Sequence, residues 1–286
     1  MRVMAEVDRL RADGVAVIGG LLAPSRAERL RAVADGLRER YLRRDPVTGR
    51  RGFLVGPWSI AHLEHPGFYE GAPDWWFPEL MGTVADPSIL ALWRIATGDE
   101  PHFAVAALFI DPVMPLSADL SLHSAAGPGG AGRWHRDTAA SRSDEDERAE
   151  LLRGGLDEAG HILEIALVPS DAFEYVPGSH ARWDTPVELQ ARKHGMAIEE
   201  RTQPLPGARR IELGTGDAVL VDTRGIHRGW YTPGVARRTL TLWYLSASRL
   251  ARHPGEEHNL CRLDRARVEG LPAVVREFFQ RELPGR

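Results

Sequence analysis

Short apolar runs separated by glycine and proline fill the chain from residue 102 to residue 246. Such runs are typical of β-strands, and strands that recur at short intervals with turn residues between them are typical of a barrel or a sandwich. The sequence therefore predicts a mainly β core. Its expected strands are Phe103–Ile110, Asp119–His123, His161–Val168, Phe173–Val176, Arg210–Leu213, Ala218–Asp222 and Thr239–Leu245.

Helical patterns flank this core on both sides. Apolar residues recur at helical spacing up to Ala12 and from Pro24 to Arg44, with a short strand at residues 14–18 between them. Residues 51–86 contain several tryptophans and prolines with little periodicity and predict irregular structure. We expect one domain over residues 1–286, with a helical preface to about residue 100 that ends in a helix at Ser88–Thr97, a barrel over about 102–246, and a C-terminal helix within about 265–283.

Composition and charge limit the partners of the chain. The 286 residues are 43% hydrophobic, enough for one large core, and the net charge of −4 comes without a basic run, which argues against a nucleic-acid partner. No apolar stretch is long enough for a membrane span, and the polar N-terminus does not resemble a signal peptide. The single cysteine, Cys261, cannot form an internal disulfide. We therefore expect a cytoplasmic protein that acts on a small molecule, with its oligomeric state left open.

One histidine motif carries most of the chemistry that the sequence predicts. His135 and Asp137 are two positions apart, and His227 follows about ninety residues later. Two imidazoles and one carboxylate are the ligands of the facial triad that holds non-haem Fe(II) and leaves other coordination positions open. We predict that these three residues bind iron and form the catalytic centre.

A second motif, ten residues after His227, predicts a site for a carboxylate co-substrate. Arg237 and Thr239 begin an apolar strand, in which alternation places their side chains on the same face. A guanidinium can bind a carboxylate with two hydrogen bonds, and the hydroxyl can add a third. We predict that the pair binds 2-oxoglutarate. Arg238 is the alternative clamp, and both arginines could also be surface residues of the strand.

Together with two further segments, these motifs resemble the phytanoyl-CoA dioxygenase family of Fe(II)/2-oxoglutarate oxygenases. The segments are Asp13–Leu22, followed by a helix, and Val176–His180, so the resemblance spans about residues 13–246. It implies a double-stranded β-helix core with flanking helices, and it assigns iron to the three ligands above and 2-oxoglutarate to Arg237. Arg136 stands where the family usually has glutamine, and the segment that follows is longer and more charged than usual.

Other side chains near the motifs are weaker candidates. The resemblance suggests that His123 contacts 2-oxoglutarate, with a buried barrel histidine as the alternative. Trp134 and Trp230 flank the ligands and could form a substrate wall or pack in the core. His180 is expected to be structural within its turn. Four histidines without a motif are expected on the surface: His161, His194, His253 and His258.

Residues 141–160 form a charged insertion that closely follows Asp137. The segment is typical of a solvated surface helix and loop, and the alternative is a lid over the site. Because it is rich in Asp, Glu and Arg, we expect it to bury little apolar area and to have little that holds it in place.

These observations predict an Fe(II)/2-oxoglutarate-dependent dioxygenase that uses O2 to hydroxylate a small organic substrate, with formation of succinate and CO2. A natural-product intermediate is favoured over a fatty acyl-CoA, because the arginines are scattered among acidic residues. Desaturation, ring closure and epoxidation are alternative outcomes. Two other classes stay open: a cupin-like metal-dependent isomerase or hydrolase without 2-oxoglutarate, and a non-catalytic barrel that serves in binding.

Overall fold

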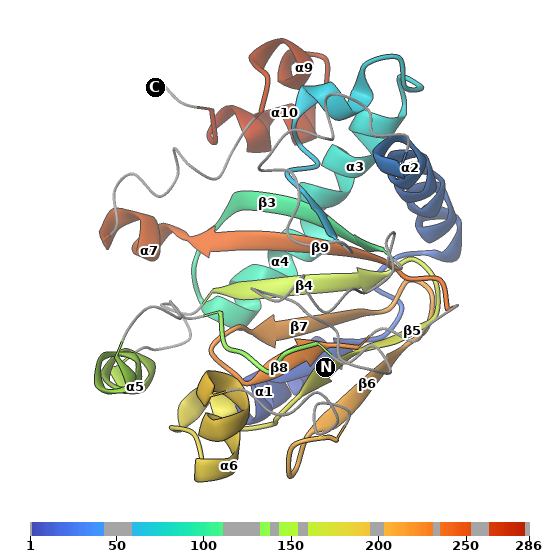
Figure 1. The fold of residues 1–286 in the computed structure, drawn as a ribbon. Helices are drawn as coiled ribbons and strands as arrows, with labels where there is room; N and C mark the ends of the chain where they lie inside the picture. The colour runs from blue at the N-terminus through green and yellow to red at the C-terminus, as the bar shows by residue number, and fades with distance from the viewer. Residues whose placement is uncertain are drawn as a thin grey trace.

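The computed structural model describes residues 2–42, 59–110, 132–137, 143–153, 160–194, 203–230, 235–252 and 263–283. Two antiparallel sheets form the centre of the fold (Figure 1). Within these ranges, the large sheet has the strand order β1 (Val15–Ile18), β7 (Ala218–Asp222), β4 (His161–Ala166), β9 (Arg238–Ser246), β3 (Pro101–Ile110) and β2 (Ser59–Ala61). The small sheet has the order β6 (Arg209–Leu213), β5 (Ser170–Tyr175) and β8 (His227–Gly229).

Alternation along β9 explains why the two sheets stack. Leu240 and Leu242 lie in the larger apolar core with the helices, whereas Trp243 packs against the second core between the sheets. Phe173 and Tyr175 of β5 belong to this second core. One face of the large sheet is therefore covered by helices and the other by the small sheet, which confirms a mainly β, double-stranded β-helix core with flanking helices.

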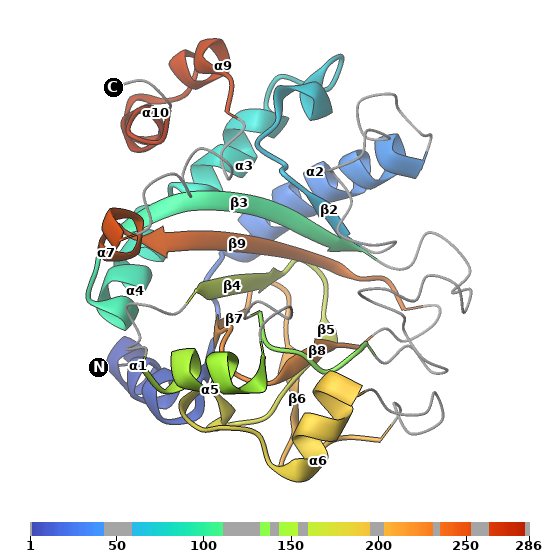
Figure 2. The ribbon, with the colours of Figure 1, turned by 60° about the vertical axis from the view of Figure 1, so that its left-hand side comes forward.

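Helices supply the larger core (Figure 2). α1 (Arg2–Asp13), α2 (Pro24–Leu42), α3 (Trp76–Val84) and α4 (Pro87–Thr97) precede the barrel, and α9 (Arg265–Glu269) and α10 (Ala273–Gln280) follow it. On the charged helix α2, the buried residues recur at intervals of three and four, and this stripe packs in the core: Ala27, Leu30, Ala34 and Leu37. The shorter elements are η1 (Pro66–Tyr69), α5 (Asp144–Arg153), η2 (Ser179–Ala181), α6 (Pro186–Leu189), η3 (Gln190–His194) and α7 (Ala247–Arg252).

Several elements differ from the sequence-based prediction. Irregular structure for residues 51–86 is wrong in part, because α3 lies within them. Its buried residues have helical spacing, which the neighbouring prolines obscure: Phe77, Leu80, Met81 and Val84. The expected helical preface also contributes β1 and β2 to the large sheet. The C-terminal helix is two helices, since Gly270 and Pro272 lie between them. The strand expected at Asp119–His123 lies outside the described residues.

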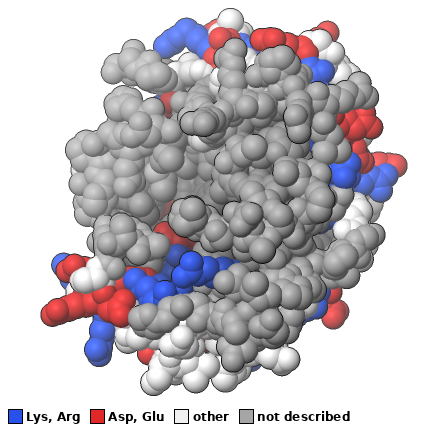
Figure 3. All heavy atoms as spheres, in the orientation of Figure 1, with Lys and Arg blue, Asp and Glu red and all other residues white. Residues whose placement is uncertain are grey.

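The surface mixes charges of both signs. On the face that Figure 3 shows, basic and acidic side chains of the described residues lie next to each other, for example at the lower left, where Figure 1 places α5. The sequence of α5 explains this mixture, since its first turn is acidic and Arg153 lies in its last turn. Within the described ranges, no helix is both long and apolar enough to cross a membrane.

Candidate metal centre

The three predicted iron ligands lie on two extended segments that pair with each other. Residues 132–137 run beside β8, and the backbones of His135 and His227 exchange two N–H···O hydrogen bonds of 3.0 Å. Further along, the backbone N–H of Asp137 donates to the carbonyl oxygen of Thr223 at 3.0 Å. β8 also pairs with β5 on its other side. Backbone hydrogen bonds therefore fix both ligand segments to the small sheet.

The side chains of His135, Asp137 and His227 converge. Their ligand atoms all lie within 4.8 Å of one another. Asp137 Oδ1 is 3.5 Å from His135 Nε2 and 3.7 Å from His227 Nε2. The side chain of His227 is only 5% exposed, whereas those of Asp137 and His135 are 28% and 47% exposed. The three groups therefore form a small polar site with His227 at its buried side.

The hydrogen bonds of the two imidazoles suit metal binding. Nδ1–H of His135 donates to the carbonyl oxygen of Arg133 at 2.8 Å, and Nδ1–H of His227 donates to that of Gly225 at 2.9 Å. Each Nε2 then carries the lone pair, and both Nε2 atoms face Asp137. Burial, followed by the nearby His135, lowers the pKa of His227 to about 4, so this imidazole is neutral at pH 7. The donor set therefore fits a divalent metal ion.

The two arginines at the start of β9 point to opposite faces. Arg237 Nε donates to Thr239 Oγ1 at 3.3 Å, and its guanidinium lies 4.8 Å from the centroid of the Phe109 ring. Arg238 Nε donates to Asp35 Oδ1 of α2 at 2.6 Å. The structure thus places Arg237 together with Thr239, as strand alternation predicts, and it fastens Arg238 to a helix on the other side of the sheet.

A buried carboxylate beside Arg237 was not among the predicted site residues. Glu164 of β4 is 5% exposed, and its Oε2 lies 3.9 Å from Arg237 Nη2. Burial raises the pKa of Glu164, Arg237 lowers it, and Asp137 raises it further. Thr241 is paired opposite Glu164 in the sheet and is also buried. The sequence signal was an acidic residue within an otherwise apolar strand, a pattern that indicates a buried polar group.

Comparison with protein families identifies the class of this site. The family model for phytanoyl-CoA dioxygenase (PhyH) matches residues 10–230. The chain belongs to this family. PhyH proteins are Fe(II)- and 2-oxoglutarate-dependent oxygenases, so this chain is an enzyme of that type and uses iron, 2-oxoglutarate and O2. The two alternative classes that the sequence left open are thereby set aside.

Solved structures share the PhyH fold at low sequence identity. AviO1 from Streptomyces viridochromogenes Tue57 is 21% identical, with a TM-score of 0.56, and the match covers 86% of this chain and 95% of that one. SnoN, a non-heme alpha ketoglutarate dependent epimerase from nogalamycin biosynthesis, is 17% identical with a TM-score of 0.53, covering 86% and 81%. EctD from S. alaskensis with bound Fe is 18% identical with a TM-score of 0.53, covering 86% and 77%. No curated protein matches the chain.

In this PhyH protein, the two tryptophans considered for the substrate wall lie on the outer face of the small sheet. Trp134 is 2% exposed, and its ring lies 4.2 Å from the guanidinium of Arg228. Trp230 contacts Arg228 at 5.1 Å and Arg210 at 4.6 Å. Alternation along β8 puts Arg228 on the opposite face from His227. The described contacts of both rings are therefore those of the packing alternative.

His180 of the PhyH turn is buried and far from solvent, as its structural role predicts. It is 3% exposed, and its Nε2 donates to the carbonyl oxygen of Arg11 at 3.2 Å. The ring also packs against Gly14, since a Cβ at that position would lie 2.5 Å from His180 Nδ1. Gly14 has φ +79°, which favours glycine as well. His180 thus joins the turn to the segment between α1 and β1.

The prediction of a surface position is wrong for His161. This histidine is fully buried on β4 and packs edge-on against Trp93 of α4, at 5.5 Å between ring centroids. Its strand lies between β7 and β9 inside the large sheet, so both faces of the strand are covered. The predicted 2-oxoglutarate contact His123 lies outside the described residues, as do His253 and His258.

The charged insertion is held more firmly than its composition suggests. Within it, α5 buries Glu147 and Leu151. Glu147 forms ion pairs with Arg192 at 2.7 Å and with Lys193 at 2.6 Å, both on η3. The expectation that little holds the insertion in place is therefore wrong for α5. Closure over a substrate stays a prediction, and residues 141–142 and 154–159 lie outside the described ranges.

Proposed function

We propose that His135, Asp137 and His227 hold the Fe(II) of this oxygenase. The observation that carries the proposal is the convergence of two Nε2 lone pairs and one carboxylate on paired backbone segments. Three ligands on one side of an ion leave its other positions for a co-substrate and O2. Iron bound there, together with 2-oxoglutarate and O2, supplies the oxidising chemistry, in which 2-oxoglutarate is converted to succinate and CO2.

We assign the distal carboxylate of 2-oxoglutarate to Arg237 and Thr239. The guanidinium is 5% exposed, and the Phe109 ring and the Thr239 hydroxyl keep it in place before any ligand arrives. A buried, oriented cation binds a carboxylate more strongly than an exposed one, because less solvent screens the charges. His123 is kept as a proposed additional contact.

We further propose that the enzyme hydroxylates a small organic molecule, of the kind made in natural-product biosynthesis. The nogalamycin biosynthetic origin of SnoN supports this substrate class through the shared fold. The residues described above bind and orient the co-substrate, and they leave the choice of the oxidised carbon to the position of the substrate. Desaturation, ring closure and epoxidation are therefore alternative outcomes at the same site.

Succinate formation is the direct test of this function. The purified enzyme, given a panel of natural-product intermediates, is expected to form succinate only when Fe(II), 2-oxoglutarate and O2 are all present. A product that has gained one oxygen atom would identify hydroxylation, and one that has lost two hydrogen atoms would identify desaturation or ring closure. Succinate formation that continues without iron would contradict the proposal.

Replacing Glu164 with glutamine is expected to tighten 2-oxoglutarate binding. The Glu164 carboxylate competes with the distal carboxylate of 2-oxoglutarate for Arg237, and glutamine keeps its size without the charge. We expect the Kd of 2-oxoglutarate to fall by about 3- to 10-fold, or about 0.7–1.4 kcal/mol, as measured by anaerobic calorimetry. Glu212→Gln, at an exposed position of β6, is the control. Weaker binding in Glu164→Gln would instead mean that Glu164 holds Arg237 in its binding position.

A further inference from the structure

Arg136, between two of the proposed ligands, uses its whole guanidinium inside the protein. Its side chain is fully buried and forms an ion pair with Asp184 at 2.5 Å. It also donates to the carbonyl oxygens of Ser179 at 2.7 Å, Arg182 at 3.3 Å and Arg224. With two bonds to Asp184, it makes five hydrogen bonds, as many as its N–H donors allow. No other side chain could make all of these contacts at once.

These contacts join the two segments that carry the metal ligands. Arg136 lies on the strand of His135 and Asp137, and the carbonyl that it binds at Arg224 lies three residues before His227. Ser179 connects the same parts, because its Oγ accepts the backbone N–H of Ile226 at 2.7 Å. The guanidinium therefore fixes the distance between the ligand strand and the loop that leads into His227.

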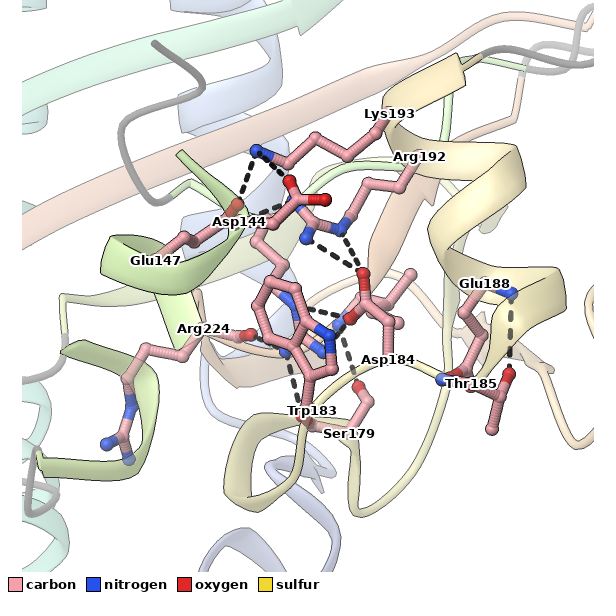
Figure 4. Close-up of polar contacts among 12 residues, drawn as sticks. Asp144, Glu147, Ser179, Trp183, Asp184, Thr185, Glu188, Arg192, Lys193 and Arg224 are labelled. Atoms are coloured by element: carbon pink, nitrogen blue, oxygen red, sulfur yellow. Dashed lines mark hydrogen bonds and ion pairs between the residues drawn. The ribbon is translucent and has the colours of Figure 1, made fainter. Parts of the chain in front are cut away.

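The same contacts continue outward to the insertion. Asp184 also binds Arg192 at 2.8 Å, and Arg192 binds Glu147 of α5 at 2.7 Å (Figure 4). Lys193 adds a second cation to Glu147 at 2.6 Å. Figure 4 shows Asp184, Arg192, Glu147 and Lys193 in one continuous chain of contacts. We call these four residues and Arg136 the Arg136 network.

Charges alternate in sign along the Arg136 network. Asp184 and Glu147 are both fully buried, and each lies between two cations. In a buried chain of this kind, the loss of one charge leaves its neighbour without compensation, so a change at one end alters the whole chain. α5 is thus connected electrostatically to the residue between His135 and Asp137.

We propose that Arg136 is a positioning residue for the metal centre and that the docking of α5 stabilises metal binding through the Arg136 network. This inference rests on the proposed iron ligands. Coupling between two sites is reciprocal, so docked α5 should tighten metal binding, and bound metal should stabilise docked α5 by the same factor. The insertion is then part of the metal centre's support and does not move independently of it.

Glu147→Gln tests the coupling from the end of the network that is remote from the metal. The full-length apo protein is titrated anaerobically with Fe(II) or Co(II) against a chelating dye. We expect the metal Kd to rise by about 3- to 10-fold, which is less than or equal to the usual effect of losing a group that orients a ligand. Glu145→Gln, at an exposed position of the same helix, should leave the Kd unchanged.

Hydrogen exchange of residues 144–153 gives the reciprocal measurement. Metal should slow exchange of these amides in the natural protein and have a smaller effect in Glu147→Gln. A merely structural Glu147 would lower the melting temperature but leave the metal Kd equal and α5 insensitive to metal, and this result would overturn the inference. A natural protein that binds no metal at all would instead overturn the proposed ligands.

Arg136→Lys tests the central residue directly. Lysine keeps the positive charge but offers a compact ammonium with fewer donors, so it cannot replace the five hydrogen bonds. We expect a larger increase in metal Kd than for Glu147→Gln, and an unchanged Kd in a folded Arg136→Lys protein would overturn the positioning role. If this variant does not fold, Glu147→Gln and its control still decide the question.

Discussion

Asp137→Ala is expected to weaken Fe(II) binding by about 100-fold or more while the protein stays folded. Loss of groups that merely orient ligands typically costs about 10- to 100-fold in metal affinity, and Asp137 is the proposed carboxylate ligand itself. Its described polar side-chain contacts, to His135 at 3.5 Å and to His227 at 3.7 Å, are with the other two ligands. Metal titration of the apo protein measures the loss, and circular dichroism checks the fold.

Two comparisons make this result specific. Asp171→Ala removes an aspartate that is paired with Arg210, with a side chain 47% exposed, and should leave the metal Kd unchanged. His227→Ala should also abolish tight binding, but it removes a buried ring that packs against Tyr175, so its stability falls as well. Full iron-dependent activity in Asp137→Ala would remove this residue from the ligand set.

The sequence predicted the parts of the site that depend on local spacing. His135 and Asp137 are two residues apart on an extended segment, so their side chains share a face, and the same alternation separates Arg237 from Arg238. The sheet strands were predicted for the same reason, since an apolar run bounded by turn residues carries its own signal. The mainly β core followed from these local patterns.

The contacts that the sequence did not predict join residues far apart in the chain. Glu147 and Arg192 are separated by 45 positions, and Arg136 and Asp184 by 48, so no local pattern announces either ion pair. The charged insertion therefore looked weakly held. His161 was misplaced for a similar reason, because its burial depends on helix α4 packing over a central strand.

Arg237→Ala is expected to weaken 2-oxoglutarate binding by about thirty-fold to about a thousand-fold, or about 2–4 kcal/mol, because a buried charge-assisted contact is lost. The loss is increased by Glu164, which would remain beside the bound carboxylate without its nearest cation. Metal affinity should change little, which distinguishes this variant from Asp137→Ala. Anaerobic calorimetry of the metal-loaded protein gives both quantities.

Arg238→Ala is the matched control on the neighbouring position. Arg238 binds Asp35 of α2 on the opposite face of β9, so its loss should lower the free energy of unfolding and leave the Kd of 2-oxoglutarate nearly unchanged. The two variants remove the same side chain one residue apart, and the ratio of their 2-oxoglutarate Kd values therefore reports the face of the strand on which the co-substrate lies. A larger effect for Arg238→Ala would move the clamp by one residue and, because alternation fixes the faces, would place 2-oxoglutarate on the helical side of the sheet.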